Sequence, residues 1–333
     1  MTAAARRLHA SLQRLWYQPQ PWLWLLAPLG WFYQLIMLLR EWLYRSGVLP
    51  VQRVGVPVIV VGNITVGGTG KTPLVLWLAD YLQRQGYRPG IVSRGYGGTA
   101  TDEPQQVRAD SDPAQVGDEP VILARRSGCP VAVCRQRYFA ARGLVEHNGC
   151  DIIISDDGLQ HLALGRDIEI AVIDGQRRLG NGLCLPVGPL REGRGRLRRV
   201  AAVVTSGKAG RGEHSMSYQP QPLQSLNDER RQALDAWRDR TVHAVAGVGN
   251  PGRFFSLLRR QGLRLITHEF PDHHVYSHAE LQFNDEYPLV MTEKDAIKCT
   301  GLALRNAWYL PIIAALPKTF EYRLNHLLQA LAD

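Results

Sequence analysis

Residues 58–72 read Val58-Ile59-Val60-Val61-Gly62-Asn63-Ile64-Thr65-Val66-Gly67-Gly68-Thr69-Gly70-Lys71-Thr72. The apolar run at 58–61 predicts a buried β-strand, and the helical spacing of apolar residues at 74–82 predicts a helix directly after the glycine-rich turn. Glycines let backbone N–H groups point at phosphate oxygens, and the positive end of the helix dipole attracts the same charge. The stretch therefore predicts a P-loop that binds a nucleoside triphosphate. The alternative is a chance glycine-rich turn.

We expect the residues of this turn to contact the nucleotide. The expected contacts come from Thr65, Val66, Gly67, Gly68, Thr69, Gly70, Lys71 and Thr72. Lys71 can reach the β- and γ-phosphates, and the Thr72 hydroxyl can ligand Mg²⁺. The general pattern G-x-x-x-x-G-K-[ST] has glycine where this chain has Thr65, so the match departs from the pattern at one position.

Strand and helix patterns alternate beyond the P-loop. Continuous apolar runs, rather than alternating ones, mark strands that are buried on both faces of a parallel sheet. Further runs lie at 88–93, 131–133, 151–157, 169–174, 200–205 and 241–246. They predict an α/β fold of the P-loop NTPase type, a mostly parallel sheet with helices on both faces. Active residues should lie in loops at the carboxyl ends of its strands.

Three parts are expected along the 333 residues, a length that suits more than one domain. Residues 1–48 are expected to form a hydrophobic, membrane-associating helical segment, and residues 49–222 the P-loop core. Residues 223–333 are expected to form a smaller C-terminal α/β domain. The polar stretch 207–224 predicts the linker that precedes this domain.

Composition limits the partners and the compartment. The formal net charge of +9 predicts an acidic partner, which could be nucleic acid, an anionic membrane or a phosphorylated substrate. The five cysteines are an odd number without metal-type C-x-x-C pairs. We therefore expect reduced, structural thiols in a cytosolic compartment.

The N-terminal segment favours the membrane among these partners. Residues 22–39 contain one strongly polar side chain, Gln34, and a helix of that length is about 27 Å long against a hydrocarbon core of roughly 30 Å. Pro28 and Gly30 interrupt its centre. Five of the eight tryptophans and several arginines gather here: Trp16, Trp22, Trp24, Trp31, Trp42, Arg6, Arg7, Arg14, Arg40 and Arg45. We expect an interfacial or re-entrant anchor on the cytoplasmic face, with a spanning helix or a buried core helix as alternatives.

Two adjacent carboxylates, Asp156 and Asp157, follow the apolar run at 151–154. Carboxylates after a buried strand of a P-loop protein are the expected place for the acid that organises Mg²⁺. Two such groups repel each other unless a cation or a donor lies between them. The alternative is a solvated acidic turn. The residues that follow the two acids are Gly158, Leu159, Gln160 and His161.

An arginine-rich stretch runs from Arg191 to Arg199 and contains Glu192 as its one acid. Planar guanidinium groups bind phosphate in bidentate fashion, so the stretch predicts phosphate contacts. No aromatic residue is interleaved, which argues against single-stranded nucleic acid bound by base stacking. A solvated basic face is the alternative for the more distal arginines.

Two further clusters are candidates for proton chemistry. Asp118 and Glu119 lie in a turn that leads into a predicted helix, and Asp272, His273 and His274 follow a strand-like run. A contact between histidine and aspartate would make a general base near neutral pH. Each cluster alone is more often structural than catalytic.

These motifs, in this order, resemble the tetraacyldisaccharide 4′-kinases, the lipid A 4′-kinases of Gram-negative bacteria. The matching stretches are 61–73, 93–97, 117–120, 156–161, 180–182, 185–186, 188–192, 246–251, 272–274 and 292–295. The resemblance spans nearly the whole chain, and Thr65 is usual in that family.

The resemblance implies ATP-dependent phosphorylation of the 4′-hydroxyl of a tetraacylated glucosamine disaccharide 1-phosphate at the cytoplasmic face of the inner membrane, with no nucleic-acid partner. Lys71 and Thr72 would hold ATP and Mg²⁺. Asp156 and Asp157 would organise the metal with Glu192. The expected roles of the remaining residues are these: Asp118 as base, His273 rather than His274 as its partner, and Arg191 and His161 near the phosphates or the substrate.

Two other classes of protein share the P-loop. A GTPase switch would carry Asn-Lys-x-Asp, whereas Lys294 and Asp295 are adjacent in this chain. A membrane-associated ATPase that drives a partner would turn over ATP without a lipid acceptor, which the kinase interpretation does not predict.

Overall fold

The computed structural model describes residues 15–18, 21–99 and 102–331. The larger of its two sheets has nine strands in the order β15-β8-β7-β6-β1-β5-β2-β4-β3. These strands are β1 (Val58–Gly62), β2 (Pro89–Ser93), β3 (Gln105–Val107), β4 (Val131–Val133), β5 (Ile152–Ser155), β6 (Ile168–Asp174), β7 (Ala202–Ser206), β8 (His214–Pro220) and β15 (Ile312–Ala315). Pairing is parallel from β4 through to β8 and antiparallel at the two edges. The mostly parallel sheet predicted from the apolar runs is confirmed.

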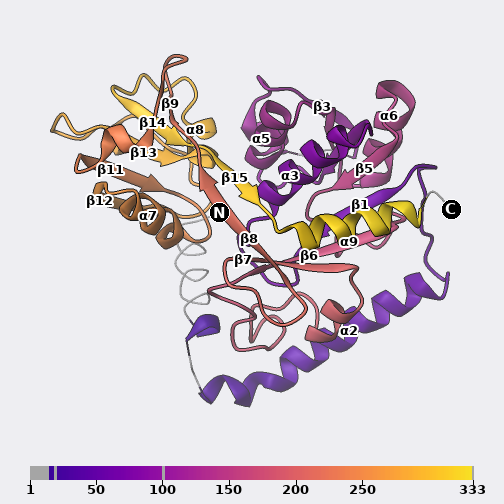
Figure 1. Ribbon diagram of the computed structural model, residues 1–333. Helices are drawn as coiled ribbons and strands as arrows, with labels where there is room; N and C mark the ends of the chain where they lie inside the picture. The colour runs from indigo at the N-terminus through magenta and orange to yellow at the C-terminus, as the bar shows by residue number, and fades with distance from the viewer. Residues whose placement is uncertain (1–14, 19–20, 100–101, 332–333) are drawn as a thin grey trace.

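Helices cover both faces of this sheet (Figure 1). One face packs against α3 (Lys71–Arg84), α5 (Asp118–Ser127), which follows the single turn α4 (Pro113–Val116), and α9 (Lys318–Gln329). The other face packs against α6 (Arg137–Asn148) and the loops between residues 159 and 200. Strand β1 lies between β5 and β6, so the P-loop and the acids that follow β5 emerge side by side.

The second sheet has six strands in the order β10-β9-β14-β13-β11-β12. They are β9 (Leu223–Ser225), β10 (Arg231–Gln232), β11 (Thr241–Ala246), β12 (Arg264–Glu269), β13 (Leu289–Thr292) and β14 (Ala307–Leu310). Helices α7 (Pro251–Arg260) and α8 (Glu293–Lys298) flank it, and its two faces have separate apolar cores. The carboxyl ends of β11 and β12 carry the loops that face the larger sheet.

Two expected boundaries differ from the structure. The polar stretch 207–224, expected as a linker, contains β8, whose alternating burial suits a strand near the sheet edge. The expected C-terminal domain at 223–333 differs from the structure at its C-terminal end. Strand β15 pairs with β8, and α9 packs on the core of the larger sheet, so both belong to the larger unit. Strand β15 completes the edge of the sheet by pairing with the backbone groups of β8, and amphipathic α9 buries Phe320, Leu324 and Leu328 against the core of the larger sheet.

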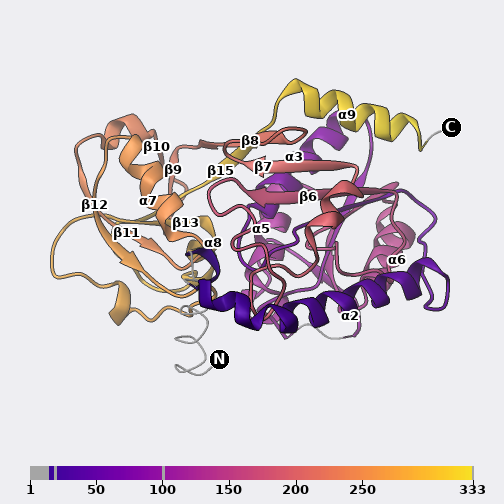
Figure 2. The same ribbon diagram turned by 90° about the horizontal axis from the view of Figure 1, so that it is seen from below.

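The N-terminal helix lies lengthwise against the loops beneath the larger sheet (Figure 2). A short 3₁₀ turn, Pro21–Leu26, leads into α2 (Ala27–Arg45). Pro28 lies in the first turn of α2, and Gly30 is buried where an added Cβ would be 3.0 Å from the Cys184 carbonyl oxygen. The expected interruption of the helix at these two residues is therefore wrong, since proline fits a first turn and glycine allows close packing.

Most of this helix is exposed and apolar. Residues 21–45 are long and apolar enough to cross a membrane: an 18-residue window within them has mean hydropathy 1.6, and 17% of that window is buried. The exposed large side chains are Trp22, Trp24, Leu25, Leu26, Leu29, Trp31, Phe32, Leu35, Ile36, Leu38, Leu39 and Trp42. Trp16 differs from Trp22, Trp24, Trp31 and Trp42, because it is buried and its Nε1 donates to the Pro186 carbonyl at 3.0 Å. Arg6, Arg7 and Arg14 lie outside the described residues.

Candidate active site

The P-loop takes its shape from two glycines and one asparagine. Gly67 and Gly70 have φ of +103° and +91°, a conformation that glycine adopts at little cost. The Asn63 amide donates to the carbonyls of Thr65 at 2.8 Å and of Gly67 at 3.3 Å. Helix α3 then begins at Lys71, with Gly70 as its N-cap. The loop is thus held open at a helix N-terminus, which is the geometry that binds phosphate.

Arg191 lies beside this loop because residues 189–191 pair with it. Val66 donates its N–H to the Pro189 carbonyl at 2.8 Å, and Arg191 donates its N–H to the Ile64 carbonyl at 2.7 Å. The Arg191 guanidinium lies 3.2 Å from Asp157 Oδ2, on the side of the loop where β5 ends. The structure therefore brings together the predicted residues Arg191, Asp157 and Lys71.

Asp157 is surrounded by positive charge. Its Oδ1 lies 3.4 Å from Lys71 Nζ, and the Arg137 guanidinium donates to its carbonyl at 2.9 Å. Burial would raise the pKa of Asp157, but the charges of Lys71, Arg191 and Arg137 outweigh it and lower that pKa to about 2. Asp157 is therefore ionised at neutral pH, and its carboxylate holds the Lys71 ammonium in place.

Its neighbour Asp156, by contrast, has no hydrogen-bonded partner for its carboxylate among the described residues, and its pKa is raised. The side chain is buried, and neither carboxylate oxygen has a hydrogen-bond partner within residues 15–18, 21–99 and 102–331. Burial, together with the charge of Glu119, raises the pKa of Asp156 to about 7, although Lys71 opposes the shift. A buried carboxylate without a partner is costly, and a bound cation would remove that cost. The pair is therefore more than a solvated acidic turn.

The remaining predicted metal ligands are Thr72 and Glu192. Thr72 follows Lys71 in the first turn of α3, as a P-loop hydroxyl should. Glu192 has donors on both carboxylate oxygens: Gln160 Nε2 at 2.5 Å and Arg196 Nε at 3.0 Å. These contacts leave Glu192 less available to a metal than Asp156 is.

Asp118 and His273 meet across the two sheets. Asp118 begins α5, His273 follows β12, and His273 Nδ1 lies 3.2 Å from Asp118 Oδ2. His274 instead contacts Glu280, 3.1 Å away, so His273 is the histidine that reaches Asp118. Burial would raise the pKa of Asp118, but the contact with His273 and the charge of Lys294 outweigh it and lower that pKa to about 2.

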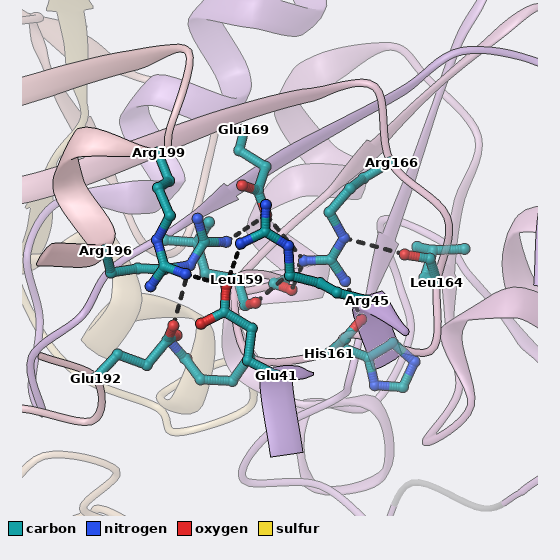
Figure 3. Close-up of polar contacts among 12 residues, drawn as sticks. Glu41, Arg45, Leu159, His161, Leu164, Arg166, Glu169, Glu192, Arg196 and Arg199 are labelled. Carbon is teal, nitrogen blue, oxygen red and sulfur yellow. Dashed lines mark hydrogen bonds and ion pairs between the residues drawn. The ribbon is translucent and has the colours of Figure 1, made fainter. Parts of the chain in front are cut away.

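A polar network joins α2 to the site (Figure 3). Arg196 pairs with Glu169 and Glu192, and Arg199 lies 2.5 Å from Glu41 of α2. These two arginines, expected to bind phosphate, are committed to carboxylates of the protein, because ion pairing compensates the burial of Arg196. His161 accepts from Arg166 through its carbonyl. Burial and several nearby arginines lower the pKa of His161 to about 3, so its imidazole is neutral at pH 7.

The C-terminal unit touches the P-loop through the loop that follows β11. An added Cβ on Gly249 would lie 2.8 Å from the Gly68 nitrogen, which shows how closely the two loops approach. Just beyond this loop, Arg253 of α7 pairs with Asp174 at the end of β6, at 2.6 Å. The candidate site is thus built from the carboxyl ends of both sheets.

Residues 22–329 match the family described as tetraacyldisaccharide-1-P 4′-kinase. The chain belongs to this family. The tetraacyldisaccharide 4′-kinase of Nitrosococcus oceani is 51% identical over 319 residues, covering 96% of this chain and 94% of the relative. That of Alkalilimnicola ehrlichii is 53% identical over 290 residues, 87% of each chain. LpxK from Aquifex aeolicus, solved in complex with ATP, has a TM-score of 0.75 at 29% identity, covering 91% of this chain and 97% of that one.

Sequence reasoning assigned no role to several residues that form the site of this tetraacyldisaccharide 4′-kinase family member. They are Asn63, Arg137, Gln160, Asp174 and Lys294. Arg137 and Asp174 lie at or just beyond the carboxyl ends of β4 and β6, so the sheet rule could have found them. Lys294 and Gln160 lie inside the matching motifs but face partners that are distant in sequence.

Proposed function

We propose that this chain transfers the γ-phosphate of ATP to the 4′-hydroxyl of a tetraacylated glucosamine disaccharide 1-phosphate, at the cytoplasmic face of the inner membrane. This step would place the chain in lipid A biosynthesis. The observation that carries the proposal is the convergence of a P-loop, the Asp156-Asp157 pair and the Asp118–His273 contact in a chain of this family. Phosphoryl transfer depends mainly on positioning and charge neutralisation, which these groups supply.

The residues that would hold ATP fit a triphosphate. The Thr69 hydroxyl is buried and has no hydrogen-bond partner among the described residues, as expected of a group that faces a ligand. The proposed contacts are Thr65, Val66, Gly67, Gly68, Thr69, Gly70, Lys71 and Thr72. Lys71 would neutralise charge on the transferred group, and Arg191 and His161 would contact the phosphates or the acceptor.

The residues present also fit Mg²⁺. The unpartnered oxygens of Asp156 are the donors that a hard cation prefers, and the Thr72 hydroxyl lies in the adjacent first turn of α3. We propose Asp156 and Thr72 as ligands. Asp157 and Glu192 would line the site while they keep their ion pairs with Lys71, Arg191 and Arg196. When bound, Mg²⁺ neutralises phosphate charge. Asp157 keeps Lys71 oriented toward the same place.

Asp118 and His273 are proposed to accept the proton of the acceptor hydroxyl as a pair. Asp118→Ala and His273→Ala should each lower kcat by roughly 10²-fold with little change in ATP affinity, because general-base assistance is lost and the P-loop is untouched. If the two act as one unit, the double variant should lose little more than the worse single variant. Single-turnover kinetics measure this. Losses that multiply would mean that the two residues do separate jobs.

The N-terminal helix is proposed as a monotopic anchor. It stays packed along its length against the loops of the larger sheet, through Leu23, Ala27 and the Glu41–Arg199 pair, and a spanning helix would break these contacts. The low buried fraction argues against a core helix. Its exposed tryptophans and leucines suit the headgroup boundary, where a four-chain lipid acceptor also lies.

Removing residues 1–46 should release the protein from membranes and leave a nucleotide-binding core, because β1 begins only at Val58. In the full chain, a triple variant with Trp24→Gln, Trp31→Gln and Trp42→Gln should weaken vesicle binding, since these side chains are exposed. Tyr322→Gln is the matched control, because Tyr322 is 70% exposed on α9. Sedimentation with anionic vesicles measures both. A truncated protein that still sediments would assign the anchor to the basic surface instead.

The function is tested by incubating the purified chain with γ-labelled ATP and the disaccharide 1-phosphate. We expect label in the lipid, and ATP turnover that requires the lipid acceptor. Turnover without the acceptor would favour an ATPase that drives a partner. A strong preference for GTP over ATP would favour a GTPase switch.

A further inference from the structure

Lys294 brings its ammonium group among three carboxylates that come from both units of the molecule. Its Nζ lies 3.2 Å from Glu119 Oε1, 3.2 Å from Asp272 Oδ1 and 3.7 Å from Asp118 Oδ2. The side chain is 16% exposed. Asp118 and Glu119 begin α5 beside the larger sheet, whereas Asp272 and Lys294 belong to the smaller unit.

Three carboxylates so close together repel one another unless a cation compensates them. Burial would lower the pKa of Lys294, but the charges of Glu119, Asp118 and Asp272 outweigh it and raise that pKa. The same ammonium contributes to the low pKa of Asp118. Lys294 is therefore the cation that lets these acids approach one another in ionised form.

Asp272 connects this cation to the neighbouring histidine. Its Oδ1 accepts the backbone N–H of His273 at 3.1 Å and lies 3.8 Å from His273 Nε2. His273 has φ of +60°, a conformation that costs a non-glycine residue free energy and needs support from its surroundings. The support comes from Asp272, which is itself fixed by Lys294, and from the Tyr96 ring, which packs against the His273 ring in a T-shaped contact with 5.1 Å between centroids.

We propose that Lys294 is a positioning residue for proton transfer: by bridging Asp118 and Asp272, it fixes His273 against Asp118 when the two units are together. The inference rests on the proposed lipid kinase function. Lys294 does not touch the nucleotide-binding loop in this arrangement; it acts through the Asp118–His273 pair.

A second bridge between the same helices provides a matched control. Arg126 of α5 lies 2.8 Å from Glu293 of α8 and also donates to the Ile312 carbonyl at 2.8 Å. Glu293 immediately precedes Lys294 in the sequence, yet neither member of this pair contacts Asp118 or His273. The double variant with Arg126→Met and Glu293→Gln therefore loosens the same interface without touching the proton-accepting pair.

Lys294→Met should lower kcat for transfer to the disaccharide roughly 10²-fold, while KM for ATP stays within about twofold, because proton transfer alone is impaired. Lys294→Arg should restore part of the loss, since it keeps the charge. In a His273→Ala background, Lys294→Met should cost little more, because its route of action is already gone. The Arg126→Met, Glu293→Gln control should keep kcat near that of the wild type, and melting temperatures check that every variant is folded.

Hydrogen exchange separates this inference from the proposed function. Backbone amides at 272–275 should exchange faster in Lys294→Met than in the control variant, whatever the acceptor proves to be. A wild-type chain that transfers no phosphate to the disaccharide would contradict the proposed function. The exchange data would still show whether Lys294 fixes the position of His273. Wild-type kcat in Lys294→Met, an equal loss in the His273→Ala background, or unchanged exchange at 272–275 would each overturn the role of Lys294.

Discussion

Lys71→Ala is expected to abolish nearly all of the transfer activity and leave the protein folded. Lys71 is the first residue of α3, and its ammonium lies 3.4 Å from both Asp157 Oδ1 and Asn63 Oδ1, at the mouth of the P-loop. Its removal takes away a cation that would face the charge developing on the transferred phosphoryl group. One such preorganised group contributes about 3–4 kcal/mol, so we expect kcat to fall on the order of 10²- to 10³-fold.

Folding should survive this change, because Asp157 keeps its contacts with Arg191 and Arg137. Lys318→Ala is the matched control, since Lys318 is the exposed first residue of α9, as Lys71 is of α3. Steady-state kinetics and thermal melting measure the two effects separately. Near-normal turnover in a folded Lys71→Ala protein would show that residues 63–72 are not the phosphate-binding loop.

Asp156→Asn should change activity and stability in opposite directions. The substitution replaces a carboxylate ligand with a neutral amide, so the Mg²⁺ requirement should rise steeply and turnover should fall about 100-fold or more. The Mg²⁺-free protein should be no less stable, because a buried carboxylate without a partner is replaced by an uncharged group of the same shape.

Rate against Mg²⁺ concentration and melting in chelator test the two halves of this prediction. Asp157→Asn is the informative companion, because it removes the partner of Lys71 and Arg191 rather than the unpartnered acid. Asp80→Asn, on the exposed face of α3, controls for loss of charge. An unchanged Mg²⁺ curve for Asp156→Asn would make this acid a structural residue of the turn after β5.

The sequence predicted those parts of the fold that depend on local pattern. Continuous apolar runs located β1, β5 and β6, because strands buried on both faces must be apolar throughout. Strand β8 was missed because it lies next to the edge of the sheet, where a strand can expose alternate side chains. Its sequence is therefore largely polar and resembles a linker. The return of β15 and α9 to the larger sheet was missed because no local pattern specifies which sheet a strand joins.

The residues of the candidate site that lie in one loop could be predicted from the sequence. Those brought together by the packing of distant segments could not. Lys71 and Thr72 follow from spacing alone. The partners of Glu192 do not, because Arg196 lies one helical turn away in a basic stretch that could equally have faced solvent. The role proposed for Lys294 depends on the packing of α8 against α5, which joins residues about 175 positions apart in the sequence.

The returning C-terminal segment bears on how the chain folds during synthesis. Helix α9 covers the P-loop helix: the Trp77 and Phe320 rings lie 5.5 Å apart between centroids, and the Tyr81 hydroxyl donates to Asn325 at 2.6 Å. A ribosome releases residues 312–329 after the whole six-stranded sheet has emerged. The side of α3 that carries Trp77 and Tyr81 therefore stays uncovered throughout most of translation, and the smaller sheet can fold before the larger one is complete. A nascent chain stalled before Ile312 would present that uncovered side to chaperones.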